Sequence, residues 1–440
     1  MAVEYFNVQD ATVRVLNWRN LRKIDWFMPV LVMALVVMGW ATLYSAIRSA
    51  DPSIFSKQII AFIVGTSIAA IIVCMDYRFL VAIAPVMYVG AVLLLEAVLQ
   101  FGEERQGATR WLMLGPVEIQ PSEFCKIVMI YVLTWYFTTI GERIRKLPYF
   151  ILPFILTGIP MLQILRQPNL GTGLAFPPLL IAMLFIAGCR IRHLIGLMMV
   201  GLSLFPVVWV QMKNYDPAFE AFSADLDKNK IVTEQEFLDR FPDLGVAAFQ
   251  RMDANQSGQL EVDGKGRIEK SWWQLHNHQK KRIYTFLHPE KSDRDTIWQV
   301  KQSMITVGSG GLAGKGYLQG TNTRLSYLPE HHTDFIFCLV AEERGFIGVA
   351  FVIGLFTAFL MRGLTFAKEC PEMMGTLLAT GVVTILAFHV FVNIAITVGM
   401  LPVTGIPLPF MSYGRSFYLT TMICVGILLN VPMRRRLFVN

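Results

Sequence analysis

The sequence predicts an all-α, polytopic membrane protein with about ten transmembrane helices. Of its 440 residues, 54% are hydrophobic and 16% are charged, with a mean hydropathy of +0.49. This composition lies outside the range of soluble globular proteins. About ten apolar runs approach the roughly 20 residues that cross a bilayer core as a helix. The basic residues between these runs also follow an alternating pattern, which is typical of membrane proteins.

The apolar runs define the predicted helices. A polar, basic stretch of about 25 residues precedes the first run and lacks a small-residue cleavage pattern. We therefore expect an uncleaved first helix and not a signal peptide. The runs begin near Trp26, Gln58, Phe79, Phe124, Phe150, Thr172, His193, Phe346, Thr376 and Met411.

Lysine and arginine residues predict the orientation. They cluster in every second connection, and basic residues in short loops stay on the cytoplasmic side. Both termini are therefore expected to be cytoplasmic. The formal net charge of +7 follows from this pattern and does not indicate nucleic-acid binding. The clusters are Arg19, Arg22 and Lys23; Arg78; Arg143, Arg145 and Lys146; Arg190 and Arg192; Arg362 and Lys368; and Arg434 to Arg436.

The six cysteines give no sign of a disulfide framework. All of them fall in or beside apolar runs or predicted cytoplasmic connections, and small apolar packing is the usual role of such residues. They are Cys74, Cys125, Cys189, Cys338, Cys370 and Cys424.

A polar, acidic stretch from about Asp216 to Lys270 interrupts the apolar pattern between the seventh and eighth predicted helices. This change in composition indicates a small helical insert in a large extracytoplasmic loop. Residues 1–212 are predicted to contain the N-terminus and helices one to seven, and residues 213–275 the insert. Residues 276–345 form the rest of the loop, and residues 346–440 contain helices eight to ten and the C-terminus.

Two segments of the insert have the ligand spacing of EF-hand loops, in which oxygens at positions 1, 3, 5, 7, 9 and 12 surround Ca²⁺. Position 6 of the first loop is Lys230, where glycine normally makes the sharp turn. The second loop has the expected Gly258, but its position 12 is Gly264, so the adjacent Asp263 is the candidate carboxylate. The candidate ligands are Asp225, Asp227, Asn229, Ile231, Thr233 and Glu236, and then Asp253, Asn255, Ser257, Gln259 and Asp263.

The two loops begin at Asp225 and Asp253, a separation that is typical of a paired EF-hand unit. Extracellular EF-hand modules bind Ca²⁺ with dissociation constants of about 10⁻⁴ to 10⁻³ M. We therefore expect the insert to hold Ca²⁺ in a structural role. The alternative is an acidic, solvated loop that matches the pattern by chance.

A series of motifs occurs in order outside the insert and gives the chain a strong resemblance to the SEDS family of peptidoglycan polymerases. Within that family, the stretch from Pro329 to Phe335 resembles the rod-shape-determining branch more than the division branch. The motifs are Arg110-Trp111; Gln120 to Lys126; Gln167 to Thr172; the glycine-rich run Gly308 to Gly316; Leu328 to Phe337; Phe391 to Asn393; Leu401 to Pro409; and Ser412 to Gly414.

The resemblance implies a glycosyltransferase of the bacterial cytoplasmic membrane that acts in cell elongation and shape control. It would transfer the growing, lipid-pyrophosphate-linked glycan to lipid II on the extracytoplasmic face, with residues 276–345 as the catalytic loop. Asp334 is the implied general base, and it lies where this loop meets an apolar run. An ionisable group at a membrane boundary is a functional candidate in its own right. The alternative role for Asp334 is a helix N-cap.

The pyrophosphate leaving group requires positive charge or a metal ion. A divalent cation at the transfer site is therefore a further candidate. Glu123 and Lys126 stand at i and i+3 on one helix face and can pair within the membrane, either as a structural strut or as substrate contacts. The resemblance and the charges together give the candidate substrate-binding residues Arg110, Glu123, Lys126, Arg282, Lys315, Glu330, His332, Asn393 and Ser412.

The sequence departs from the family pattern at two positions. Asn169 stands where the family usually has Asp, and Arg415 stands where it has a second glycine after Ser412-Tyr-Gly414. Because Asp334, Glu123 and Lys126 are all kept, we still expect an active enzyme.

The family works with a class B penicillin-binding protein, a single-pass transpeptidase, which is the implied partner. Two other functions fit the same features. One is a flippase that moves lipid II across the membrane, and the other is a non-catalytic, calcium-binding scaffold for the transpeptidase.

Overall fold

The computed structural model describes residues 24–47, 53–105, 108–114, 117–167, 169–203, 231–233, 246, 259–261, 277–289, 294–321 and 333–435. The chain divides into two compact units. The first, here called the membrane unit, consists of residues 1–196 and 299–440, and the second, the loop unit, consists of residues 197–298.

Eight helices of the described residues are long and apolar enough to cross a membrane. They confirm the predicted class of an all-α polytopic membrane protein, while the count of ten spans stays a prediction. These helices are α2 (Phe27–Ile47), α3 (Ser53–Cys74), α5 (Ala84–Phe101), α6 (Pro121–Ile140), α7 (Leu147–Arg166), α18 (Ile336–Glu369), α19 (Met373–Thr397) and α20 (Arg415–Arg435).

Two predicted runs are broken in the structure. Pro85 lies in the first turn of α5, so the run near Phe79 is divided at Ile83. The run near Thr172 is likewise two short helices. The run near His193 is described as far as Ser203, in α10, and its full length stays a prediction. The helices of these three runs that were not given above are α4 (Tyr77–Ala82), α8 (Leu170–Gly173), α9 (Phe176–Ile186) and α10 (Ile191–Ser203).

Helix α18 begins at Ile336, well before the apolar run predicted from Phe346. Gly345 leaves the helical conformation with φ 62°, so that α18 consists of two helical segments on either side of a break. The charged residues Glu342, Glu343 and Arg344 just before the break lower the local hydropathy. For this reason the hydropathy pattern marked only the second segment.

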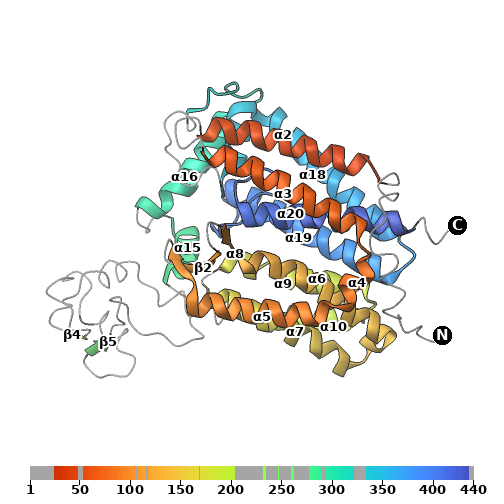
Figure 1. Ribbon diagram of the computed structural model, residues 1–440. Coiled ribbons are helices and arrows are strands. Elements are labelled where there is room, and N and C mark those ends of the chain that lie inside the picture. The colour runs from red at the N-terminus through yellow and green to blue at the C-terminus, as the bar shows by residue number, and fades with distance from the viewer. Residues whose placement is uncertain are drawn as a thin grey trace. The chain divides into compact units, whose positions relative to one another are not determined.

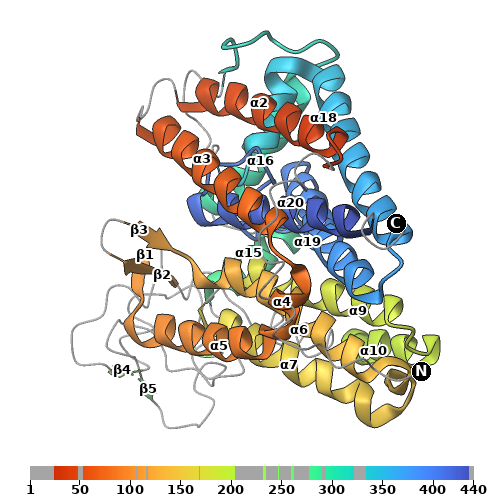
Figure 2. The same cartoon turned by 45° about the vertical axis from the view of Figure 1, so that its right-hand side comes forward.

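Helices α19 and α20 lie in the middle of the membrane unit, with α2 and α18 along one edge and α5 and α7 along the other (Figure 1). The same order is visible in the turned view (Figure 2). Glycines allow α3 and α20 to pack closely, since a Cβ on Gly426 would lie 3.0 Å from the Cα of Ala69. The central helices are therefore covered by protein and the edge helices are left to face lipid.

A small antiparallel sheet joins α5 to α6 and defines one end of the membrane unit, here called the sheet end. Its order is β1-β2-β3, with Leu112 opposite Ile119 in the second pair of strands. The backbone N–H of Gln120 donates to Ser416 Oγ over 3.1 Å, which ties the sheet to the start of α20. The strands are β1 (Glu103–Arg105), β2 (Ala108–Leu114) and β3 (Val117–Ile119).

The opposite end of the membrane unit is held by ion pairs. Arg362 of α18 pairs with Asp25, and Arg78 pairs with Glu372. The Tyr77 hydroxyl also donates to Glu372 over 2.6 Å, and burial together with this carboxylate raises the pKa of Tyr77. Two of the arginines predicted to be cytoplasmic are therefore gathered at this end.

The described parts of the loop unit include two short strands, β4 (Ile231–Thr233) and β5 (Gln259–Glu261), and the helix α15 (Asn277–Leu287). The strands pair antiparallel, with Val232 opposite Leu260. Helix α16 (Arg294–Ser309) begins in this unit and continues into the membrane unit. The predicted extracytoplasmic loop thus contains helices that the hydropathy pattern did not indicate.

Candidate functional site

Asp334 lies in a turn directly before α18 and is half-buried. The N-cap residue of α18 is Phe335, and no side chain caps this helix. Asp334 therefore does not occupy the capping position that was its alternative role.

Asn393 of α19 holds the backbone of Asp334 in place. Its Nδ2 donates to the Asp334 carbonyl over 2.8 Å and to the Ile406 carbonyl over 2.7 Å. Asn393 is completely buried, so it acts on the chain that carries Asp334 and presents no surface to a substrate. The resemblance identified this residue, but not this role.

The break in α18 is filled by the glycine-rich segment that follows α16. A helix break leaves backbone groups without their usual partners, and these must find others when they are buried. Phe346 N–H donates to the Gly311 carbonyl over 2.9 Å, and Ile347 N–H donates to the Leu312 carbonyl over 3.2 Å. The segment thus completes one side of the break.

The other side of the break is completed in the same way. Lys315 N–H donates to the Glu342 carbonyl over 2.9 Å, and Gly316 N–H donates to the Glu343 carbonyl over 3.0 Å. Residues 308–320 are consequently docked on α18 by backbone hydrogen bonds, and we call them the docked loop.

The close approach explains why the docked loop is rich in glycine. A Cβ on Gly310 would lie 1.9 Å from the Ala341 carbonyl oxygen, and a Cβ on Gly314 would lie 2.2 Å from that of Glu343. Gly314 also has φ 81°, which side chains rarely adopt. Only glycine fits at these two positions without a shift of backbone.

A buried carboxylate fixes the end of the docked loop. Glu342 has no exposed surface, and its Oε1 accepts from Lys315 Nζ over 2.7 Å and from Thr321 N–H over 2.8 Å. Lys315, a predicted substrate-binding cation, is therefore paired with a carboxylate. Thr321 is thus bonded to a residue of α18, and Asp334 directly precedes the same helix.

Tyr317 lies on the docked loop with its ring 6.0 Å from the Arg344 guanidinium. Partial burial, and then the neighbouring Glu343, raise the pKa of Tyr317. The phenol is therefore protonated at neutral pH and adds no negative charge to this part of the site.

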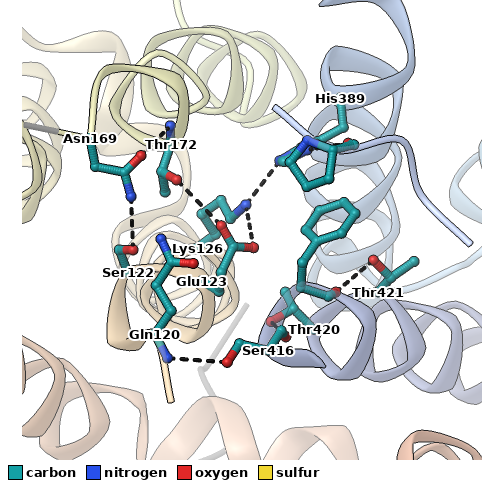
Figure 3. Close-up of polar contacts among 12 residues, drawn as sticks. Gln120, Ser122, Glu123, Lys126, Asn169, Thr172, His389, Ser416, Thr420 and Thr421 are labelled. Atoms are coloured by element: carbon teal, nitrogen blue, oxygen red, sulfur yellow. Dashed lines mark hydrogen bonds and ion pairs between the residues drawn. The ribbon is translucent and has the colours of Figure 1, made fainter. Parts of the chain in front are cut away.

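A second polar cluster lies between the helices of the membrane unit (Figure 3). Glu123 Oε2 and Lys126 Nζ of α6 are 2.9 Å apart and almost fully buried, so the predicted ion pair is present. Lys126 Nζ is also 2.9 Å from His389 Nε2. Because the Lys126 ammonium can only donate, Nε2 of His389 is the acceptor of this hydrogen bond. The hydrogen of the imidazole is then on Nδ1, which lies 3.4 Å from the Pro407 carbonyl oxygen.

Helix α20 closes the cluster with an aromatic ring. His389 stacks on Phe417 with ring centroids 4.9 Å apart, and Lys126 Nζ lies 5.5 Å from the centre of the same ring. The cluster joins α6, α19 and α20. Sequence reasoning missed His389, because a lone histidine in an apolar run carries no spacing signal.

Asn169, the first departure from the family pattern, is the N-cap of α8. Its side chain accepts from Thr172 N–H over 3.4 Å and donates to Ser122 Oγ over 3.3 Å. Thr172 in turn donates to Glu123 over 3.3 Å. An amide can make both Asn169 contacts and places no second carboxylate near Glu123.

Arg415, the second departure, forms an ion pair of 2.6 Å with Glu118 of β3. The additional positive charge is therefore balanced by a carboxylate of the sheet, and it binds the sheet to the start of α20.

The remaining candidate residues are spread over the chain. Arg110 of β2 is half-buried, and its Nε donates to the Gln167 carbonyl over 3.4 Å. Ser412 is fully buried, and its Oγ accepts from Leu408 N–H over 2.8 Å within a turn. Arg282 belongs to the loop unit. Glu330 and His332 lie outside the described residues.

No group of three or more His, Cys, Asp or Glu side chains among the described residues could hold a metal ion. Of the candidate calcium ligands, only Ile231, Thr233 and Gln259 are described. The others, Asp225, Asp227, Asn229, Glu236, Asp253, Asn255, Ser257 and Asp263, lie outside the described residues. All six cysteines are described, and none of them is joined to another by a disulfide.

The family profile described as cell cycle protein, which covers FtsW, RodA and SpoVE, matches residues 22–275 and 267–437. The chain belongs to the FtsW/RodA/SpoVE family. The family deduced from the motifs is therefore confirmed, while the rod-shape-determining branch stays a prediction.

Members of the FtsW/RodA/SpoVE family match over nearly the whole chain. The peptidoglycan glycosyltransferase RodA of Treponema pallidum is 29% identical, covering 95% of this chain and 99% of its own. MrdB of Escherichia coli, also named a peptidoglycan glycosyltransferase, is 30% identical and covers 94% and 95%. A probable peptidoglycan glycosyltransferase FtsW of Trichlorobacter lovleyi is 31% identical and covers 94% of each chain.

Two solved structures of similar proteins share the fold. A chain of a peptidoglycan synthase complex, described as coordinating polymerization and crosslinking, has a TM-score of 0.70 and 27% identity, covering 94% of this chain and 98% of its own. The rod shape determining protein RodA of Thermus thermophilus has a TM-score of 0.60 and 25% identity, covering 94% and 97%.

Proposed function

We propose that this protein is a peptidoglycan glycosyltransferase that joins lipid II units into glycan strands during cell elongation. The named activity of the RodA and MrdB relatives supports this proposal, since each matches more than nine-tenths of the chain. The FtsW relative is equally similar, so the elongation role rests on the motif around Asp334 alone.

The observation that carries the proposal is the anchoring of Asp334. The Asn393 amide donates to the Asp334 carbonyl, and Glu342 of the following helix accepts from Lys315 of the docked loop. A general base must be held within hydrogen-bond reach of the proton that it removes. Asp334 would accept the proton of the acceptor sugar hydroxyl as this oxygen attacks the anomeric carbon of the lipid-pyrophosphate donor.

The developing negative charge of the pyrophosphate requires a cation. Lys315 is already paired with Glu342, and Lys126 is buried with Glu123. Arg110 donates to a neutral carbonyl and is half-buried at the sheet end. The candidate cations for this charge are Arg110, Lys126, Arg282 and Lys315, with a divalent cation as a further candidate.

The active site is proposed to face the outside of the cytoplasmic membrane. The basic residues predicted to be cytoplasmic include Arg78 and Arg362, which lie at the end opposite the sheet. Lipid II presented at the outer surface would then reach the sheet end.

A class B penicillin-binding transpeptidase is the proposed partner. The related synthase complex is described as coordinating polymerization with crosslinking. The proposed docking face lies on α18 and α19, where α18 presents the exposed apolar residues Phe346, Ile347 and Phe351.

We also propose that residues 213–275 form an EF-hand-like insert in the loop unit. The ligand spacing from Asp225 and from Asp253 supports this interpretation.

The test of the main proposal is polymerisation of lipid II by the purified full-length protein in liposomes. We expect glycan strands from the wild-type chain and from Lys301→Gln, a matched control on the exposed face of α16. Asp334→Asn should form strands at least about 100-fold more slowly. Transport of lipid II without strands would favour the flippase, and unchanged polymerisation by Asp334→Asn would exclude this residue as the base.

A further inference from the structure

Two side chains of α19 hold consecutive carbonyls of the chain between α19 and α20, residues 398–414, which we call the α19–α20 segment. Asn393 Nδ2 donates to the Ile406 carbonyl over 2.7 Å, and His389 Nδ1 lies 3.4 Å from the Pro407 carbonyl oxygen. His389 and Asn393 stand at i and i+4, so they lie on the same face of α19. Both are buried. The α19–α20 segment is therefore fastened to α19 at two adjacent residues.

Each of these two side chains has a second partner. Nδ2 of Asn393 also donates to the Asp334 carbonyl over 2.8 Å. Nε2 of His389 lies 2.9 Å from Lys126 Nζ, and Lys126 is itself paired with Glu123 (Figure 3). The buried charges of α6 are thus joined to the backbone of Asp334 by way of His389, the α19–α20 segment and Asn393.

The charge of Lys126 fixes which nitrogen of His389 carries the hydrogen. A neutral imidazole has one donor nitrogen and one acceptor nitrogen. Because Nε2 accepts from the ammonium, the hydrogen is on Nδ1, and only in this tautomer does the ring donate to the Pro407 carbonyl. With the hydrogen on Nε2, the ring would set an N–H against the ammonium and a lone pair against the carbonyl oxygen. Lys126 therefore prepares His389 to hold the α19–α20 segment.

The amide of Asn393 is oriented by the α19–α20 segment. Its nitrogen carries two hydrogens, which lie in the plane of the amide and point in fixed directions. One hydrogen goes to the Ile406 carbonyl and the other to the Asp334 carbonyl. The position of the Ile406 carbonyl consequently sets the direction in which Asn393 holds the main chain of Asp334.

We infer that His389 is a positioning residue for Asp334, acting through Pro407, Ile406 and Asn393. The inference rests on the proposed function, in which Asp334 is the general base. His389 is buried and is bonded on both sides by protein, so it orients the base and does not contact substrate. A shift of about 1 Å at a catalytic group can reduce the rate by up to 10²-fold. Loss of His389 should therefore act on the chemical step.

The experiment measures kcat and KM of lipid II polymerisation by the purified full-length protein in liposomes. We expect His389→Leu to lower kcat about tenfold at unchanged KM. His389→Gln should keep most of the wild-type kcat, because an amide offers an acceptor to Lys126 and a donor to the Pro407 carbonyl. Thr384→Val is the matched control on α19, since the Thr384 hydroxyl donates within the helix to the Thr380 carbonyl. Its kcat should equal that of the wild type.

A double variant tests whether His389 acts through Asp334. In Asp334→Asn the proposed base is already absent, so its orientation no longer matters. Adding His389→Leu should therefore leave the residual kcat of Asp334→Asn unchanged, whereas independent effects would multiply.

The tautomer of His389 gives a readout that depends neither on activity nor on the leucine variant. Nitrogen-15 NMR of the histidine-labelled protein, assigned by comparison with His389→Gln, should show the hydrogen on Nδ1. A hydrogen on Nε2, a wild-type kcat in His389→Leu, equal losses in His389→Leu and His389→Gln, or multiplying effects in the double variant would each overturn the inference alone. A wild type that forms no strands would overturn the proposed function and this inference with it.

Discussion

The membrane unit and the loop unit are stabilised in different ways. In the membrane unit, buried charges such as Lys126 and Glu123 are paired with one another, and backbone groups freed at Gly345 are paired with the docked loop. In the loop unit, the insert at residues 213–275 is rich in acidic residues, and the structure describes only residues 231–233, 246 and 259–261 of it. The first unit supplies its own counter-charges, whereas the second, by our proposal, takes them from Ca²⁺.

The largest expected effect is the loss of activity in the membrane unit without loss of its structure. Asp334→Asn removes the proposed base, which should lower the rate of lipid II polymerisation on the order of 10²- to 10⁴-fold. Its apparent melting temperature in detergent should stay close to that of the wild type. A variant that both melts early and loses activity would show that Asp334 has a structural role instead.

The next effect concerns stability. Lys126→Met leaves Glu123 buried without its counter-charge, and breaking such a pair destabilises a protein by about 3–5 kcal/mol. The double variant Lys126→Met with Glu123→Gln removes both charges and should recover most of this loss. Thermal unfolding of the two purified variants checks the prediction. Equal destabilisation of both would mean that the contacts with His389 and Thr172, and not the charge balance, dominate.

The docked loop connects stability with activity. Gly314→Ala places a methyl group against the Glu343 carbonyl and should displace the docked loop. We expect a polymerisation rate about tenfold lower, because a misplacement of about 1 Å near a catalytic group can reduce rates by up to 10²-fold. Gly308→Ala is the matched control, because a Cβ there meets no atom within 4 Å. Similar rates for the two variants would show that docking does not position Asp334.

Calcium should affect only the loop unit. Removal of Ca²⁺ with a chelator should speed proteolytic cleavage within residues 213–275, because strands and loops would lose their metal. The melting temperature of the membrane unit should not change. Mass spectrometry of the fragments after brief proteolysis gives the measurement, and an earlier melting of the membrane unit would contradict the separation of the two units.

The smallest expected effect is at the sheet end. Arg415→Gly restores the residue that the family usually has and removes a partly exposed ion pair with Glu118. Such pairs contribute about 0.2–1 kcal/mol, so unfolding should shift slightly and polymerisation should remain. A large loss of activity would instead place Arg415 in the site.

The sequence predicted the membrane helices well because hydropathy reports burial in lipid directly. It also predicted the pair of Glu123 and Lys126 from their spacing on one helix face. Contacts between distant segments left no such signal: His389 reaches Lys126 from 263 residues away, and the break at Gly345 depends on a loop that fills it. The strands β4 and β5 were likewise missed, because three residues are too few to show alternation.

The contacts of the candidate site residues could not be predicted from the sequence. Asn393 and Lys315 stay predicted substrate contacts, and in the structure their side chains donate to the Asp334 carbonyl and to the Glu342 carboxylate. A motif identifies which residues matter. Whether a residue touches the substrate or supports one that does depends on burial, which a single sequence does not contain.

The docked loop has a consequence for how this protein can change over evolution. Residues 308–320 are fixed to α18 by their own hydrogen bonds, so the chain before them can lengthen without moving Asp334. The stretch between α10 and α16 is therefore a natural site for grafting a foreign domain. An added domain at this place lengthens the chain without rebuilding the membrane unit.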